Sequence, residues 1–226
     1  MNELRPTEPI RFTKGKNTAK WIDNPEVRIK CVCQKCNNTW MSEIETENKP
    51  HMLQMIRDHR ITLESEQQKS LARWAILKAI ILEGADRGRV PFYGEDERRD
   101  LKPPSSFLPV GTHAWIGRFS ELGFHAGGTR IVRPLENVAE AIQGLVTTIV
   151  VGHLVIQVLT VHVLPTFVDR GSIPLAENPW KWDVSLLNIW PVFGAVQWPP
   201  AVSFTTKWPD SIGRLVFRWK VGADIG

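Results

Sequence analysis

Residues 141–168 form a run of 28 positions that contains no Asp, Glu, Lys or Arg. A run of this length is long enough to cross a membrane as a helix. It also contains Gly144, Gly152 and many β-branched residues, which favour strands buried in a protein core. We therefore expect two antiparallel strands in this run, with a bend near Gly152, and no helix over Val146–Val163.

The first half of the chain has the periodicity of helices. Hydrophobic residues of Thr62–Ala85 recur with the 3.6-residue period of a mostly buried helix. Ser65 with Gln68 three residues later predicts a capping box at its start, and Gly84 is a suitable stop. Tyr93–Leu101 is highly charged and predicts a second, short and exposed helix.

After Pro103-Pro104 the hydrophobic pattern changes to the two-residue period of strands. His113–Phe119 and Phe124–Val132 are strand candidates, and Gly127-Gly128 predicts a hairpin turn inside the second of them. The Trp- and Pro-rich end, with the pieces NPWKW, NIWP, QWPP and TKWP, predicts short edge strands and loops. Together these patterns predict an α+β fold, with helices concentrated before residue 103 and mainly antiparallel strands after it.

The same patterns divide the chain into three segments. Residues 1–60 would hold a basic arm and a Cys-x-x-Cys turn with its following helix. Residues 61–102 would be a helical scaffold, and residues 103–226 would be a β-rich region. The two prolines at 103 and 104 make the best domain boundary, because they interrupt any regular element.

The chain has 226 residues, of which 42% are hydrophobic, so it is long enough to bury a sizeable core. Its net charge of +4 is compatible with a polyanionic partner and too mild to indicate one alone. Residues 1–36 are more basic, with eight Lys and Arg against four Asp and Glu. Six of these cations would form a face that contacts the phosphates of DNA or RNA, or an ordinary solvated surface. They are Lys14, Lys16, Lys20, Arg28, Lys30 and Lys35.

All three cysteines lie within six residues, as Cys31, Cys33 and Cys36. The spacing of Cys33 and Cys36 lets one turn point two thiolates at a single metal ion. Structural zinc takes four protein ligands, so Cys31, His51 and His59 are the nearest candidates for the others. The alternative is a pair of reduced thiols without a ligand. Clustered cysteines and a charged N-terminus without the pattern of a signal peptide predict a reducing, cytoplasmic location.

Two asparagines after Cys36 suit a turn, and helical spacing follows over Thr39–Asn48. Trp40 would anchor a core or, in the alternative, offer a platform on which a base stacks. Pro50 is expected to end this helix and to begin another at His51–Arg57. A strand over 27–33, a Cys-x-x-Cys turn and a helix form the second half of a treble-clef (ββα-like) zinc finger.

The stretch CVCQKCNNTWMSEIE, followed by KPHMLQMI, resembles a group of HNH-endonuclease-like bacterial proteins. The resemblance continues through LARWAILKAIILE and the IWP and QWPP pieces, so it covers most of the chain, while its specific part is CVCQKCNNTWMSEIE. In HNH proteins a ββα finger binds a divalent metal such as magnesium and cuts a phosphodiester bond. The resemblance implies zinc at Cys33 and Cys36 and a role in positioning the catalytic loop for Asn37.

The chain departs from the HNH pattern before the Cys-x-x-Cys turn of Cys33 and Cys36, which is called the knuckle from here on. The family has a first Cys-x-x-Cys and an Asp-His or Glu-His pair there, whereas residues 1–30 contain neither His nor Cys. Either the reading frame begins upstream of Met1, or the lineage has lost the catalytic half. Without the histidine, water is not activated by the usual route.

We therefore predict an HNH-endonuclease-like, nucleic-acid-associated protein that is truncated or degenerate at its catalytic histidine. The alternative is a non-catalytic binding protein whose zinc knuckle is structural. No motif indicates a small-molecule ligand, since phosphate loops, nucleophile elbows and zinc-protease motifs are missing from the sequence.

Overall fold

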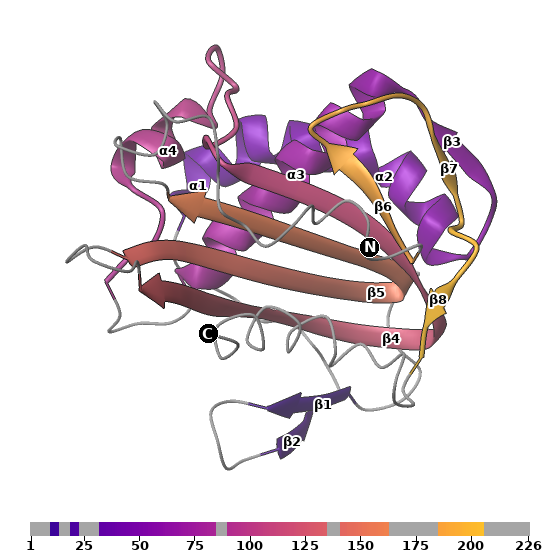
Figure 1. Ribbon diagram of the computed structural model, residues 1–226. Helices are drawn as coiled ribbons and strands as arrows, with labels where there is room; N and C mark the ends of the chain where they lie inside the picture. The colour runs from indigo at the N-terminus through magenta and orange to yellow at the C-terminus, as the bar shows by residue number, and fades with distance from the viewer. Residues whose placement is uncertain are drawn as a thin grey trace.

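The computed structural model describes residues 10–13, 19–22, 32–84, 90–134, 141–162 and 185–205. Its fold is α+β, as the sequence predicts: the described helices all precede residue 103, and the long strands follow it (Figure 1). The helical elements are α1 (Gln34–Cys36), the π-helix η2 (Asn37–Met41), α2 (Ser42–Ile56), α3 (Ser65–Glu83) and α4 (Glu95–Asp100). The strands are β1 (Ile10–Thr13), β2 (Ala19–Ile22), β3 (Ile61–Leu63), β4 (Thr112–Pro134), β5 (Ala141–His162), β6 (Leu186–Trp190), β7 (Val196–Trp198) and β8 (Ser203–Phe204).

Helices α2 and α3 pack side by side in opposite directions. Buried Asn48 of α2 donates from Nδ2 to the backbone and hydroxyl oxygens of Ser70, and Glu45 forms an ion pair with Lys78 further along α3. The break expected at Pro50 is wrong, because α2 continues through it to Ile56. Pro50 and Thr46 are both exposed, so the carbonyl that Pro50 leaves without an intrahelical donor faces water, while burial of the opposite face holds the helix together.

The start of α3 differs by one residue from the prediction. The capping residue is Glu64, whose backbone N–H donates to Gln67 Oε1 at 2.7 Å, and not Ser65. The amide of Gln68 is not available for a cap, since it is fully buried and donates to the carbonyls of Leu63 and Gly194. Buried polar groups need such partners, and this one ties α3 to the loop before β7.

Strands β4 and β5 form one long antiparallel ladder, paired from Thr112↔Thr160 to Pro134↔Ala141 with one shift of register. The hairpin turn expected at Gly127-Gly128 is wrong: both glycines lie within β4, paired with Thr148 and Thr147. β6 adds to the first part of β4 in antiparallel fashion, and β8 pairs with it in parallel at Arg118 and Phe119. Two smaller pairs are β1 with β2 and β3 with β7, both antiparallel.

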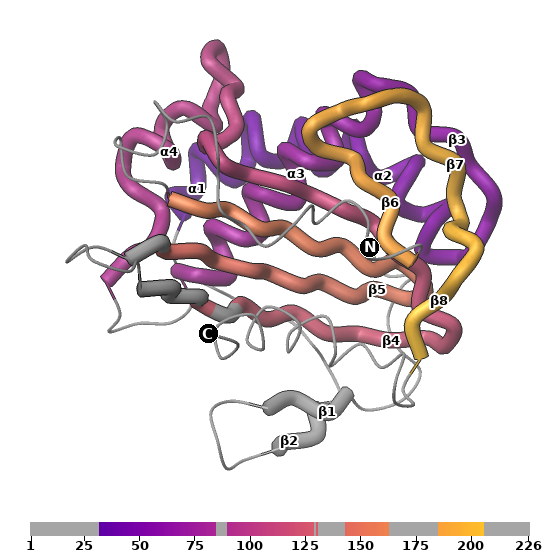
Figure 2. The backbone as a smooth tube through the Cα atoms, in the orientation of Figure 1, coloured from indigo at the N-terminus to yellow at the C-terminus, as the bar shows by residue number. Residues whose placement is uncertain are grey.

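The ladder bends where the sequence predicts, at Gly152. This glycine has φ +57°, and the register of the ladder shifts between Arg118 and Gly123 on the opposite strand. The two halves of β5 consequently lie side by side (Figures 1 and 2), and Gln157 Nε2 donates to Thr148 Oγ1 between them. This arrangement explains the uncharged run, because the paired halves of β5 occupy the interior of the sheet.

Helices α2 and α3 cover one face of this sheet (Figure 1) and share one hydrophobic core with it. That core joins residues from both sides of Pro103-Pro104. Its members include Ile44, Met52, Met55, Leu71, Ala75, Ile76, Ala114, Ile116, Leu154, Ile156 and Val158. Within the described part of the chain, no helix has the length and apolar character that a membrane crossing requires.

Candidate functional site

The Cys-x-x-Cys turn stands at the start of the helical region. Cys33 has extended backbone angles (φ −72°, ψ 149°) and caps α1, and its Sγ accepts the backbone N–H of Cys36 at 3.2 Å. The backbone N–H of Asn37 donates to the Cys33 carbonyl at 3.0 Å, which closes the turn. Cys33 is exposed, whereas Cys36 is partly buried and packs against the core. One thiol is therefore anchored and the other is presented to solvent.

Hydrogen bonds and charge favour the thiolate form of Cys33. Its pKa is lowered from the ordinary value, first by a hydrogen bond from the Cys36 thiol and then by the backbone N–H of Cys36. The backbone of Lys35 and the cationic side chain of Lys102 act in the same direction. Stabilised thiolates of this kind serve as metal ligands and as nucleophiles.

The backbone departs from α-helix directly after the knuckle. Asn37–Met41 forms a π-helical segment, and Thr39 within it has φ −112° and ψ −112°, outside the helical region. The Thr39 hydroxyl donates to the Lys35 carbonyl at 2.8 Å, which stabilises the irregular turn. The side chains of Asn37 and Asn38 are exposed here, with Asn37 Nδ2 3.4 Å from Asn38 Oδ1. Single π-turns inside α-helices occur frequently at functional sites.

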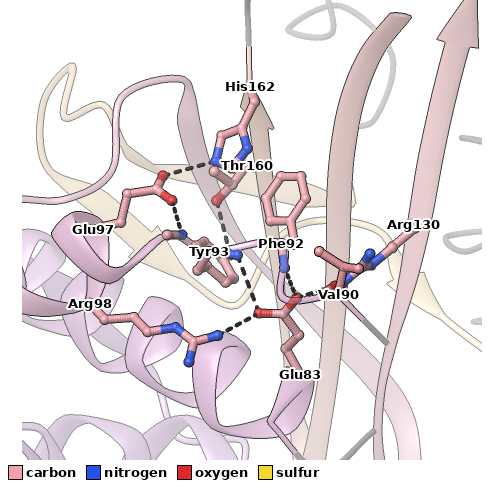
Figure 3. Close-up of polar contacts among 10 residues, drawn as sticks. Glu83, Val90, Phe92, Tyr93, Glu97, Arg98, Arg130, Thr160 and His162 are labelled. Carbon is pink, nitrogen blue, oxygen red and sulfur yellow. Dashed lines mark hydrogen bonds and ion pairs between the residues drawn. The ribbon is translucent and has the colours of Figure 1, made fainter. Parts of the chain in front are cut away.

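Lys102, which the sequence does not single out, acts on the pKa of Cys33 from a different part of the chain and is the smallest of its causes. It follows α4, and the segment from Phe92 to Lys102 is attached to α3 by Glu83 (Figure 3). The Glu83 side chain is only 7% exposed and accepts the backbone N–H groups of Phe92 and Tyr93. It also pairs with Arg98 of α4 at 3.3 Å. Glu83 thus fixes both the loop that leads into α4 and α4 itself.

A second carboxylate attaches the same segment to the sheet. Glu97 of α4 accepts the Gly94 N–H at 2.8 Å and lies 2.9 Å from Nε2 of His162 at the end of β5 (Figure 3). The pKa of Glu97 is lowered: burial alone would raise it, but the hydrogen bonds from His162 and Gly94 outweigh this. The His162 ring also stacks on Phe92, with ring centroids 4.1 Å apart.

The last residues of α4 complete this attachment. Leu101 is buried, and its carbonyl accepts a hydrogen bond from Arg73 of α3 at 3.0 Å. The next residue, Lys102, is exposed and close enough to Cys33 to influence its pKa. The contacts of Glu83, Glu97 and Leu101 therefore hold in place the segment from which Lys102 acts on Cys33. No motif in the sequence indicates this, because the partners are distant in the chain.

The structure brings together four of the residues proposed from sequence, Cys33, Lys35, Cys36 and Asn37. It does not bring His51 to them: this residue lies 15 positions after Cys36, on the face of α2 that meets Gln67. At 1.5 Å per residue, a helix separates these positions by roughly 20 Å. The remaining proposed residues fall outside the described side chains. They are Lys14, Lys16, Lys20, Arg28, Lys30 and Cys31.

Cys33 and Cys36 fit zinc as half of a ligand set. Their sulfurs share one turn, and the backbone N–H directed at Cys33 Sγ is the kind of hydrogen bond that supports a thiolate ligand. Across the described ranges, no group of three or more Cys, His, Asp or Glu side chains is arranged to hold a metal ion. A complete site would therefore need ligands from beyond these ranges, from water or from a second chain.

Comparison of the chain with protein-family models, with curated proteins and with solved structures finds no match.

Proposed function

We propose that this chain is a nucleic-acid-associated protein of HNH-endonuclease-like type, whose knuckle holds zinc through Cys33 and Cys36 and lies against a phosphate backbone. The observation that carries the proposal is the knuckle itself, in which exposed Cys33 and partly buried Cys36 share one turn with exposed Lys35. The positive charge of exposed Lys102, which follows α4, also acts on the pKa of Cys33. The sequence of this turn resembles that of HNH proteins; Lys35 is part of the turn, and only Lys102 comes from a distant segment.

The chemistry of this surface suits phosphate. Lysine ammonium groups neutralise phosphates and release counterions, which supplies most of the affinity of non-specific nucleic-acid binding. The exposed amides of Asn37 and Asn38 can donate hydrogen bonds to phosphate or sugar oxygens, as such side chains commonly do. Bound zinc would hold the turn in shape, while the positive charge toward phosphate would come from the lysines.

We expect binding without cleavage at the rate of an HNH enzyme. No histidine of this chain precedes the knuckle, and His51 lies several helical turns from it. Desolvation lowers the pKa values of His113, which is partly buried, and of His125, whose side chain is exposed, and neither residue belongs to the knuckle. A plasmid-nicking assay with Mg²⁺ or Mn²⁺ checks this expectation. Robust cleavage that is lost in Asn37→Ala would contradict it.

Binding is tested by fluorescence anisotropy with labelled duplex DNA and labelled RNA over a range of salt concentrations. We expect Lys35→Gln and Lys102→Gln each to weaken binding to all sequences and to reduce the slope of log K against log salt by about one. Lys69→Gln is the matched control, because Lys69 is exposed on α3 and pairs locally with Glu66. Equal affinities for the wild type and both knuckle variants would refute the proposed surface.

A further inference from the structure

We propose that Cys33 and Cys36 form a reversible intramolecular disulfide by exchange with a low-molecular-weight disulfide, so that the knuckle alternates between a metal-binding dithiol and a metal-free oxidised state. This inference goes beyond nucleic-acid binding and does not depend on it. It follows from the positions of the two sulfurs and from their unequal exposure.

The geometry of the turn already suits a disulfide. The backbone N–H of Cys36 donates to Cys33 Sγ at 3.2 Å, so the Cys33 sulfur lies directly over the backbone of Cys36. Residues three apart in a helical turn have Cβ atoms about 5–6 Å apart, and a disulfide requires about 3.5–4.5 Å. Cys33 has an extended backbone and precedes the helical turn, so this helical spacing does not apply to it, and its side chain folds back over the first turn toward Cys36.

Unequal exposure gives the two sulfurs different roles. Exposed Cys33 is open to an external disulfide, while Cys36 is partly buried against the core. Access of the reagent decides which sulfur reacts first. Cys33 is therefore the attacking sulfur, and Cys36 is the resolving sulfur that completes the exchange.

The exchange is balanced in two steps. The Cys33 thiolate attacks one sulfur of the external disulfide, the external S–S bond breaks, and the first small thiol leaves with a proton from solvent. The Cys36 sulfur then gives up its proton, attacks Cys33 in the mixed disulfide and releases the second small thiol. The two cysteines are oxidised by two electrons, and the external disulfide is reduced to two thiols. Because the thiolate is the form that binds metal, the disulfide cannot hold zinc.

The experiment uses the full chain, reduced and freed of metal, in buffers of increasing oxidised-to-reduced glutathione ratio. Free thiols are trapped with a maleimide and counted by mass spectrometry, and peptide mapping locates the bond. The Cys31→Ser variant removes the third thiol from competition. Circular dichroism confirms that each variant keeps the secondary structure of the wild type.

We expect wild type and Cys31→Ser to lose two thiols per chain without retaining glutathione, and the bond to map to Cys33–Cys36. Cys33→Ser and Cys36→Ser should form no such bond, and Cys36→Ser should retain glutathione on Cys33. The inference is overturned if Cys31→Ser keeps both thiols free at every ratio, or if the wild-type bond maps to Cys31. If the disulfide forms as expected but the reduced chain does not bind nucleic acid, only the proposed function is refuted.

Discussion

Glu83, the last residue of α3, pairs with Arg130 of β4, and the distance between Glu83 Oε1 and Arg130 Nη2 is 2.8 Å. The same guanidinium donates to the Val90 carbonyl, so three separate segments meet at one carboxylate (Figure 3). Glu83 is buried and Arg130 is 31% exposed, which leaves the anion dependent on its partners for solvation. The contacts of Glu83 hold in place the loop at Phe92 and Tyr93 and the helix α4 that follows it. Lys102 is positioned through this segment.

Replacing Glu83 should therefore destabilise the fold. Glu83→Ala leaves two guanidinium groups and two backbone N–H groups without their acceptor, and we expect a loss of about 3 kcal/mol in the free energy of unfolding. The measurement is urea denaturation at neutral pH. Glu66→Ala is the control, since Glu66 is 83% exposed in its pair with Lys69 and should cost less than about 0.5 kcal/mol. Equal midpoints for both variants would contradict the role of Glu83.

Asp58 should make stability depend on acid pH. It follows the C-cap of α2 with φ +61°, and its carboxylate accepts hydrogen bonds from Arg118, which in turn donates to Ser203. The pKa of Asp58 is lowered, chiefly by the hydrogen bond from Arg118. A carboxyl group whose pKa is lower in the folded state than in the unfolded state stabilises the fold at pH values above the unfolded pKa, which is 3.8 for Asp58. This contribution is lost as the pH falls through the folded pKa.

Three variants of Asp58 separate charge from backbone strain. Asparagine tolerates positive φ, so Asp58→Asn removes the charge without adding backbone strain. We expect it to lower the free energy of unfolding by about 1–2 kcal/mol at neutral pH, and this deficit should shrink below about pH 4. Asp58→Ala should cost about 1 kcal/mol more, because alanine is strained at this φ, and Asp58→Gly should cost less than Asp58→Ala. Thermal melts from pH 3 to pH 7 give the comparison. A deficit of Asp58→Asn that stays constant over this range would argue against the ion pair.

Alanine substitutions at Gly152 and Gly128 test whether the chain bends at Gly152 in β5 or makes a hairpin turn at Gly128 in β4. A Cβ on Gly152 would lie 2.6 Å from the Ile56 carbonyl oxygen, at φ +57°. We expect Gly152→Ala to destabilise the protein by roughly 2–4 kcal/mol through this clash and the backbone strain. A Cβ on Gly128 meets its nearest neighbour at 3.6 Å, so Gly128→Ala should cost less than about 1 kcal/mol. Chemical denaturation measures both, and the reverse order would place the turn at Gly128.

Metal removal should leave the fold intact. The core is built from α2, α3, β4 and β5, and of the two knuckle cysteines only Cys36 packs against it. An incomplete ligand set binds zinc weakly, so we expect less than one zinc per chain and ready loss to a chelator. Elemental analysis gives the zinc content, and thermal melting with and without chelator should give the same Tm. Collapse of the melting transition after chelation would indicate a complete zinc site that contributes to folding.

Elements with a local signal could be predicted from the sequence. Gly84 follows α3 as expected, α4 lies within its predicted range, and the bend falls at Gly152. The break at Pro50 was wrong because packing of α2 against α3 outweighs the local cost of a proline. The turn at Gly127-Gly128 was wrong because both glycines pair across the ladder, which no local rule reveals.

The site could be predicted only where it is contiguous in sequence. Cys33, Cys36 and Asn37 form one turn, so their spacing alone indicated a knuckle. Lys102 could not be found this way, because its position depends on Glu83 of α3, which contacts Arg130 of β4, and on Glu97 of α4, which contacts His162 of β5. His51 was proposed from spacing along the chain, and the continuous helix carries it away from the thiols.

Cobalt(II) titration of the metal-free, reduced chain tests the central claim most directly, because thiolate ligation of cobalt gives a characteristic charge-transfer absorption. We predict that this absorption appears in the wild type, is lost in Cys33→Ser and in Cys36→Ser, and is retained in His51→Ala. No thiolate band in the wild type, or the same band in both cysteine variants, would contradict a metal-binding knuckle at Cys33 and Cys36.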